Sequence, residues 1–215
     1  KGLGRLTGDR RLRHLNRHYA SAWNITARNK EQRLALELLL DPDVQIVTLV
    51  GQAGTGKTLL AVAAALQTTV KNHTYDRILV SRPIVPLGKD IGYLPGPKEE
   101  KLSHWMQPIF DNLHYLMREK TIVRNKKRTR VLTLQEKVDK LIADGTLTLE
   151  ALTYIRGRSI PRQYVIVDEA QNLTPHEVKT IVSRAGEGTK MVLTGDPYQI
   201  DNPYLDASSN GLTYA

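Results

Sequence analysis

The stretch VQIVTLVGQAGTGKTLLAVAAALQTTV, residues 44–70, contains three patterns in succession. Residues 44–50 are a β-branched apolar run with the length of a buried strand, and residues 59–70 are rich in alanine and leucine, as in a buried helix. Between them, GQAGTGKT at 51–58 fits the phosphate-binding pattern G-x-x-x-x-G-K-[ST], which requires a strand before it and a helix after it. The stretch therefore predicts a strand, a phosphate-binding loop and a helix.

Each residue type in this loop has a physical reason to be there. Glycines let the backbone curl until successive N–H groups point at phosphate oxygens, and the following helix adds the positive end of its dipole. Lys57 is expected to reach the β- and γ-phosphates, and Thr58 to ligate Mg²⁺. A glycine turn that matches by chance is the alternative, and the flanking elements argue against it. The residues expected to bind the nucleotide here are Gly51, Gln52, Ala53, Gly54, Thr55, Gly56, Lys57 and Thr58.

Apolar strands and helices alternate along the rest of the chain. Helical spacing of apolar residues indicates a helix at 31–40, and Thr174 as N-cap with Pro175 after it indicates another at 174–186. The alternation predicts an α/β protein with a mainly parallel sheet and helices on both faces. Ligands bind such sheets at the carboxyl ends of the strands. The expected strands are 44–50, 77–83, 147–155, 163–170 and 189–196.

Two regions differ in composition from this alternating pattern. Residues 1–28 are basic and weakly periodic, and we interpret them as an N-terminal arm or linker. Residues 84–146 combine a loop rich in Gly and Pro with amphipathic stretches, which indicates a helical insertion. Residues 29–215, with this insertion, are expected to form one domain, because the chain is long enough for a single substantial core.

The sequence VIVDEAQN places two acids directly after four apolar strand residues. Asp168 and Glu169 are thereby delivered to the carboxyl end of a strand, where the phosphates should lie. Asp168 is expected to hold Mg²⁺ through water, and Glu169 to position or deprotonate the attacking water. An acidic pair at this place could instead cap the following turn. A second acid beside the metal ligand points to hydrolysis, with water as the nucleophile.

The segment LTGDPYQI, residues 193–200, has two interpretations. Gly195, Asp196 and Pro197 are residue types that shape a turn. If the strand before them lies beside the strand that carries the acids, Gln199 can reach the γ-phosphate or the attacking water with an amide that both donates and accepts. We expect the turn to fix where this sensor, Gln199, points, and we count Gln199 among the catalytic residues.

The overall composition favours a polyanionic partner. The chain carries 31 Lys and Arg against 22 Asp and Glu, a net charge of +9. Arginines gather at 5–17 and at 118–130, which are equally compatible with phosphate-binding surfaces and with solvated faces. The lack of cysteine excludes disulfides and cysteine catalysis, and the six histidines show no zinc-ligand spacing. With no apolar span or leader pattern in the sequence, we expect no membrane partner and a cytoplasmic location.

Seven segments together resemble the PhoH-like family of P-loop ATPases. The resemblance extends from about Asn29 to the C-terminal end, and it implies a RecA-like core related to superfamily 1 helicases. It also implies ATP hydrolysis with Mg²⁺ and a role on RNA. Some members carry an N-terminal PIN-type ribonuclease domain, which would be absent from this chain. The segments, in the order of the family, are NKEQ, GQAGTGKT, SRPIV, LGKDIGYLPGPKEEKLSHWMQPIFDNL, RGRSI, VIVDEAQN and LTGDPYQID.

The resemblance assigns roles to five further residues. Asn29 and Gln32 resemble the glutamine motif that reads adenine, although an exposed pair on the first turn of a helix is the alternative. Arg82, at the end of a strand, resembles a nucleic-acid or coupling arginine, although an exposed arginine at a strand end is an equally ordinary interpretation. Arg156 and Arg158 end another strand on the same rim, and either could meet RNA phosphate or serve as an arginine finger for a neighbouring subunit.

Several functions are compatible with these patterns. We expect an ATPase coupled to RNA binding or unwinding, that is, an RNA helicase module. A helicase normally uses two RecA-like units and only one fits in this chain, so a homo-oligomeric ring with an arginine supplied in trans is the expected assembly. The rival is a single-domain ATP switch. The alternative functions are a nucleotide-regulated RNA-binding module without unwinding and a small-molecule kinase.

Overall fold

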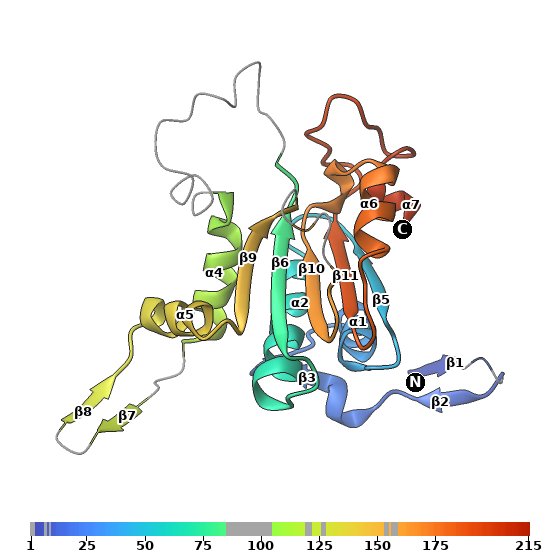
Figure 1. The fold of residues 1–215 in the computed structure, drawn as a ribbon. Helices are drawn as coiled ribbons and strands as arrows, with labels where there is room; N and C mark the ends of the chain where they lie inside the picture. The colour runs from blue at the N-terminus through green and yellow to red at the C-terminus, as the bar shows by residue number, and fades with distance from the viewer. Residues whose placement is uncertain are drawn as a thin grey trace, which may run out of the picture.

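A five-stranded sheet forms the centre of the protein. The computed structural model describes residues 3–6, 8, 10–84, 105–118, 122–125, 128–152, 155 and 159–215. The strands lie in the order β5-β11-β10-β6-β9, and every neighbouring pair is parallel (Figure 1). Their bounds are Ile46–Val50 for β5, Lys190–Gly195 for β11, Gln163–Val167 for β10, Arg77–Arg82 for β6 and Leu147–Ala151 for β9.

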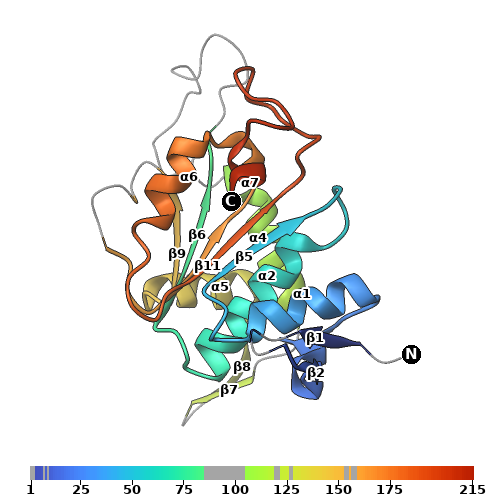
Figure 2. The same ribbon diagram turned by 90° about the vertical axis from the view of Figure 1, so that its right-hand side faces the viewer.

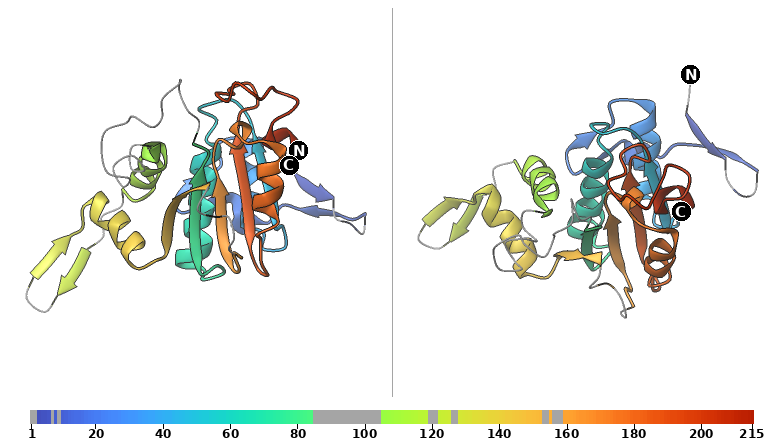
Figure 3. Two further views of the ribbon diagram at one scale, coloured as in Figure 1. Left: turned by 45° about the horizontal axis from the view of Figure 1, so that its top comes forward. Right: turned by 90° about the horizontal axis from the view of Figure 1, so that it is seen from above.

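Helices cover both faces of this sheet (Figures 2 and 3). Four of them pack on one face: α1 (Lys30–Leu40), α2 (Lys57–Leu66), α4 (Gln107–Leu116) and α5 (Leu134–Ala143). The other face is covered by α6 (Pro175–Val182) and the short α7 (Gly211–Tyr214). The expected fold class, a RecA-like α/β protein with a parallel sheet between two helical layers, is confirmed.

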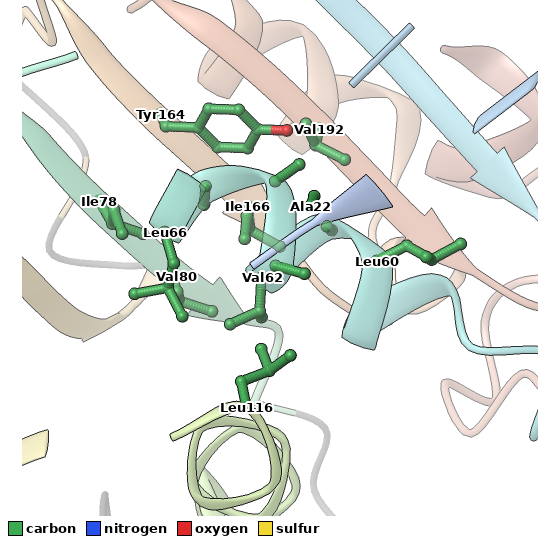
Figure 4. Packing of buried hydrophobic residues seen from close by; sticks show 14 of the residues in the cluster. Ala22, Leu60, Val62, Leu66, Ile78, Val80, Leu116, Tyr164, Ile166 and Val192 are labelled. Atoms are coloured by element: carbon green, nitrogen blue, oxygen red, sulfur yellow. The ribbon is translucent and has the colours of Figure 1, made fainter. Parts of the chain in front are cut away.

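Side chains along the three central strands, β11, β10 and β6, alternate between two separate cores. On β10, Tyr164 and Ile166 pack with α1, α2 and α4, and Figure 4 shows this packing. Val165 and Val167 belong to the core beneath α6 and α7. All four side chains are fully buried, so β10 reads as a continuous apolar run in the sequence. Each buried aliphatic side chain stabilises the fold by about 1.5–3 kcal/mol relative to exposure.

The helix boundaries follow from local capping. Thr174 caps α6 as expected: its hydroxyl accepts from the backbone N–H of Glu177, whose carboxylate in turn accepts from the backbone N–H of Thr174. Pro175 follows at the first helical position, where its missing N–H is of no consequence. Asn29 caps α1 in the same manner by accepting from the backbone N–H of Gln32.

The described part of the region 84–146 is helical at α4 and α5, as its amphipathic stretches predict. It also contains a hairpin that those stretches did not predict, formed by β7 (Ile122–Asn125) and β8 (Arg128–Val131). The β-branched residues at 122, 123, 129 and 131 favour extended backbone in this otherwise basic stretch. The hairpin extends away from the sheet beyond α5 (Figure 1).

Short paired strands precede α1. They are β1 (Gly4–Leu6) with β2 (Leu12–His14), and β3 (Ser21–Ala22) with β4 (Ile25–Thr26). The segment contacts the domain, because the backbone N–H of Asn16 donates to the Glu37 carboxylate at 2.9 Å and Ala22 is buried in the core. A domain boundary at residue 28 stays a prediction. In the part of the chain that the structure describes, no helix has the length and apolar character to cross a membrane.

A buried lysine joins α1 to the sheet. Lys190, at the start of β11, is 1% exposed, and its ammonium donates to the carbonyl oxygens of Leu38, Asp41 and Val44 at 2.6–2.7 Å. These three carbonyls lie at the end of α1 and in the loop that follows. Burial lowers the pKa of Lys190 to about 8 from its usual 10.5.

The depressed pKa of Lys190 predicts a pH dependence of stability. Between pH 8 and 10 the unfolded chain keeps the Lys190 proton while the folded protein releases it, so the free energy of unfolding rises with pH. We expect Lys190→Met to remove about 2 kcal/mol of this rise, measured by urea unfolding at a series of pH values. The exposed Lys179→Met is the control. Parallel curves for both variants would show that Lys190 is not the titrating group.

Candidate functional site

The carboxyl ends of four adjacent strands bring the expected site residues together. The phosphate loop follows β5, the acids follow β10, LTGDPYQI ends β11, and Arg82 ends β6. β11 lies between β5 and β10, as the sensor interpretation requires. The backbone N–H of Gly51 donates to the carbonyl of Gly195 at 3.3 Å, which joins the phosphate loop directly to the end of β11. The expected site is therefore one continuous edge of the sheet.

The phosphate loop has the backbone geometry of an anion cradle. Gly54 and Gly56 have φ of +78° and +88°, values that side chains other than glycine adopt at a cost. Gly56 is the N-cap of α2 and provides no side-chain cap, so the first N–H groups of the helix stay available for an anion. The Lys57 ammonium donates to the carbonyls of Gly51 and Gln52 at 2.6 and 2.8 Å, and phosphate oxygens would take over these bonds.

The two expected magnesium residues lie in contact. The Thr58 hydroxyl donates to Oδ1 of Asp168 at 2.7 Å, although 110 residues separate them in sequence. Thr194 on β11 donates to the same oxygen at 2.6 Å, and Asp168 is 3% exposed. A hydroxyl and a carboxylate beside a phosphate cradle are the hard oxygen ligands that Mg²⁺ prefers, with water and phosphate completing its shell. Thr58 and Asp168 are therefore suitable ligands for Mg²⁺.

Glu169 occupies a strained position beside this pair. Its backbone is left-handed, with φ of +58°. This conformation is uncommon for residues other than glycine, and the residues that adopt it cluster at functional sites. The sharp turn ends β10 and starts a 3-10 helix at Ala170–Asn172. The side chain of Glu169 is 38% exposed, compared with 5% for Asp168. The turn thus points one acid inward and leaves the other accessible to substrate water.

Arg82 pairs with both acids. Its Nε lies 3.3 Å from Oδ2 of Asp168 without the alignment of a hydrogen bond, and Nη2 lies 3.5 Å from Oε1 of Glu169. Nη1 donates to the carbonyl of Trp105 at 3.0 Å, and the side chain is 15% exposed. Arg82 therefore balances the charge of the site, and its expected nucleic-acid role stays a prediction. Arg156 and Arg158 lie outside the described residues.

A buried glutamine that sequence reasoning missed connects Glu169 with the loop after β11. Gln171 Nε2 donates to the Glu169 carboxylate at 2.5 Å and to the carbonyl of Gln199 at 2.9 Å, while its Oε1 accepts from the backbone N–H of Asp196. Gly195 is required here, because a side chain at this position would overlap Gln171. A polar residue following the acids was the available signal, although two of its three partners, Asp196 and Gln199, are 25 residues or more away.

Gln199, Glu169 and Arg82 line one pocket of about 340 Å³. Asn172 holds the loop that follows β11, because its side-chain oxygen accepts from the backbone N–H of Asp201 at 2.8 Å. Asp196 shapes the turn as expected, since its carboxylate accepts from the backbone N–H of Tyr198 at 3.0 Å. Gln199 and Glu169 both line this pocket, and the role of Gln199 as a sensor stays a prediction.

Gln32 contacts the phosphate loop, whereas Asn29 serves as the helix cap described above. The amide nitrogen of Gln32 donates to the carbonyl of Thr55 at 3.1 Å, and its oxygen accepts from the backbone N–H of Arg28 at 2.9 Å. Recognition of adenine by Gln32 and Asn29 stays a prediction. The contact with Thr55 gives Gln32 a direct connection to the loop that would hold the phosphates.

Together, the phosphate loop, the acids at the end of β10 and the strand order define a P-loop nucleoside triphosphatase of the RecA-like type. The sequence model of the family described as PhoH-like protein matches residues 24–215. The chain belongs to this family.

Curated relatives cover most of the chain. Protein PhoH2 of Bacillus subtilis (strain 168) is 58% identical over 193 residues, which are 89% of this chain and 41% of that protein. Protein PhoH2 of Mycolicibacterium smegmatis is 39% identical, over 93% of this chain and 42% of that protein. The chain therefore spans about two fifths of the length of these relatives.

Among solved structures, the Sulfolobus solfataricus SWI2/SNF2 ATPase core in complex with dsDNA matches with a TM-score of 0.47 and 19% identity. The match covers 82% of this chain and 34% of that one.

Proposed function

We propose that this chain binds ATP with Mg²⁺, hydrolyses it, and couples the cycle to RNA. The observation that carries the proposal is the contact between Thr58 and Asp168 at the phosphate loop, with Glu169 and Gln199 in the adjoining pocket. A protein that only binds the nucleotide needs no more than Thr58 and Asp168. An accessible second acid and an amide beside it are what water activation requires.

The residues of this chain divide the work as follows. The backbone of residues 51–57 and the Lys57 ammonium would hold the phosphates, and Thr58 and Asp168 would hold Mg²⁺, which would supply charge neutralisation. Glu169 accepts the proton of the attacking water or orients that water. Gln199 accepts from or donates to the same water. Gln171 fixes Glu169 relative to the loop that carries Gln199, because its buried amide donates to both.

RNA is the proposed coupled ligand because of the charge of the chain. The net charge is +9, and basic residues gather at 5–17 and 118–130. We further propose a homo-oligomeric ring, in which an arginine such as Arg156 or Arg158 acts on the ATP of the neighbouring subunit. Light scattering with and without ATP measures the assembly, and a strict monomer during turnover would remove the ring from the proposal.

Phosphate release with and without RNA tests the function, with Gln199→Ala as the informative variant. Gln199→Ala is expected to keep ATP affinity and to lose about 10- to 100-fold of RNA-stimulated turnover, because only the water-directed amide is removed. Gln135→Ala, on the exposed face of α5, is the matched control. Turnover by Gln199→Ala at the rate of the control would reduce the segment 193–200 to a structural turn.

The same assay separates the alternatives. Nucleotide-dependent RNA binding without phosphate release would identify a regulated RNA-binding module. Release that requires a small acceptor molecule would identify a kinase. The pairing of Glu169 with Gln171 favours hydrolysis, because it holds a carboxylate beside the pocket where an activated water would stand.

A further inference from the structure

A second pocket lies at the other end of the sheet from the phosphate loop. Its volume is about 620 Å³, within the range of about 300–1,000 Å³ that small-molecule sites occupy. Asp76 and Thr146 line it and directly precede β6 and β9, so the pocket lies at the amino ends of the strands. Arg82 ends β6 at the opposite edge, about 20 Å away along the strand. The two pockets are therefore separate sites.

The floor of this second pocket is apolar, with a buried polar group among its lining residues. Leu116 ends α4, Met117 follows it as the C-cap, and Leu141 lies on α5. Thr69 comes from the π-helix Gln67–Lys71 that continues α2, and such helices are frequent at functional sites. Thr69 is 3% exposed, and among the described residues its hydroxyl has no hydrogen-bond partner. The hydroxyl oxygen itself is buried, so Thr69 lines the pocket with its other atoms.

Two turns place residues around the second pocket. Trp23 and Asn24, with φ of +44° and +66°, form the two-residue turn between β3 and β4, and positive φ at both positions is typical of such hairpin turns. His73, with φ of +54°, follows the C-cap Asn72 of the helix Gln67–Lys71, where left-handed backbone commonly ends a helix. All three residues line the pocket.

The rim of the second pocket is positively charged. Lys71, Lys137 and Lys140 line it, whereas Asp76 is neutralised by Arg162, whose Nε lies 3.1 Å from its carboxylate. Asp144 is the other acid among the lining residues. The pocket thus combines an apolar floor with an excess of cations.

We propose that this pocket binds a nucleotide monophosphate unit. The base would lie against the apolar floor and the phosphate against Lys71 and Lys140, while Asn24 and Thr146 offer hydrogen bonds to the sugar and base edges. A free mononucleotide and a single nucleotide of an RNA strand share this chemistry. The hairpin of β7 and β8 starts and ends beside the pocket, since Met117 and Leu132 line it. The proposal does not depend on ATP hydrolysis at the phosphate loop.

The two tryptophans of the chain make the second pocket measurable. Trp23 lines it, and Trp105 lies beside Arg82 at the other site. In Trp105→Phe, Trp23 is the sole indole reporter, and the Lys71 ammonium 4.7 Å from its ring centre makes it sensitive to an anion that draws the lysine away. We expect AMP without Mg²⁺ to change this fluorescence saturably, and Lys140→Glu to raise the Kd at least about tenfold. Lys179→Glu, the same charge change on α6, is the matched control.

Each outcome has a definite meaning for the proposal. Binding of AMP supports a free nucleotide, whereas binding of a ten-nucleotide oligoadenylate without AMP supports one nucleotide of a strand. Lys57→Ala should leave either binding unchanged, which separates this pocket from the phosphate loop. If the fluorescence of Trp23 does not respond, equilibrium dialysis with radiolabelled AMP and oligoadenylate measures the binding directly. No binding by dialysis, equal competition by inorganic phosphate, or equal Kd in Lys140→Glu and Lys179→Glu would overturn the proposal.

Discussion

Glu169→Gln is expected to lower the rate of phosphate release from ATP by about 10²- to 10⁴-fold while ATP affinity changes little. The amide keeps the size of the carboxylate and can still accept from Gln171, whose donation to Glu169 is seen in the structure. It does not accept a proton at neutral pH, so the water that attacks the γ-phosphate is no longer activated. Phosphate release and binding of a fluorescent ATP analogue, measured on the same preparation, check both parts.

The control for Glu169→Gln is Glu187→Gln, which changes an exposed glutamate on the loop before β11. It removes the same charge without touching the pocket. If Glu169→Gln turns over as fast as Glu187→Gln, Glu169 has no part in the chemistry and the acid pair only shapes the turn after β10.

Lys57→Ala is expected to weaken ATP binding by about 10²-fold and to abolish measurable phosphate release. The ammonium supplies charge-assisted bonds to the phosphates, each of about 1.5–3 kcal/mol, and alanine supplies none. The fold should persist, because within the described part of the chain Lys57 donates only to carbonyls of its own loop. Calorimetric titration with ATP and Mg²⁺ measures the affinity, and thermal unfolding confirms the fold. ATP affinity equal to that of Lys179→Ala would contradict a phosphate role for the loop.

Much of the fold follows from apolar runs alone. Both faces of the sheet are covered, so strands such as β10 and β11 contain runs of consecutive apolar residues, at 164–167 and 191–193, which stand out in the sequence. The expected strand ends were less accurate: the strand expected at 163–170 ends at Val167. Glu169 adopts a left-handed backbone that no strand accommodates, and the apolar pattern carries no sign of it.

The hairpin of β7 and β8 shows a different limit. Its residues are basic and polar, with β-branched residues between them, and this composition fits a solvated helix face as well as a pair of strands. Pairing between strands decides the outcome, and composition does not reveal which partner is present. The helices on either side, α4 and α5, show clear amphipathic spacing and were expected.

The site residues likewise fall into two groups, those whose position local sequence predicts and those whose role depends on distant parts of the chain. The phosphate loop and the acids occupy positions that local sequence context determines, namely the carboxyl ends of apolar strands. Gln171 and Thr194 act through hydrogen bonds to residues more than 20 positions away, which only the folded chain brings within reach. Arg82 was expected to be a nucleic-acid or coupling arginine, and this role stays a prediction; only the folded chain shows that its guanidinium lies beside Asp168 and Glu169.

Phosphate release from ATP by the unmodified chain, with and without Mg²⁺, decides whether the phosphate loop and the acid pair form an ATPase site. We expect steady release that requires Mg²⁺, increases with single-stranded RNA, and falls to background in Glu169→Gln. ATP binding by a folded chain with no release above the Glu169→Gln background, in the presence of Mg²⁺ and RNA, would contradict it.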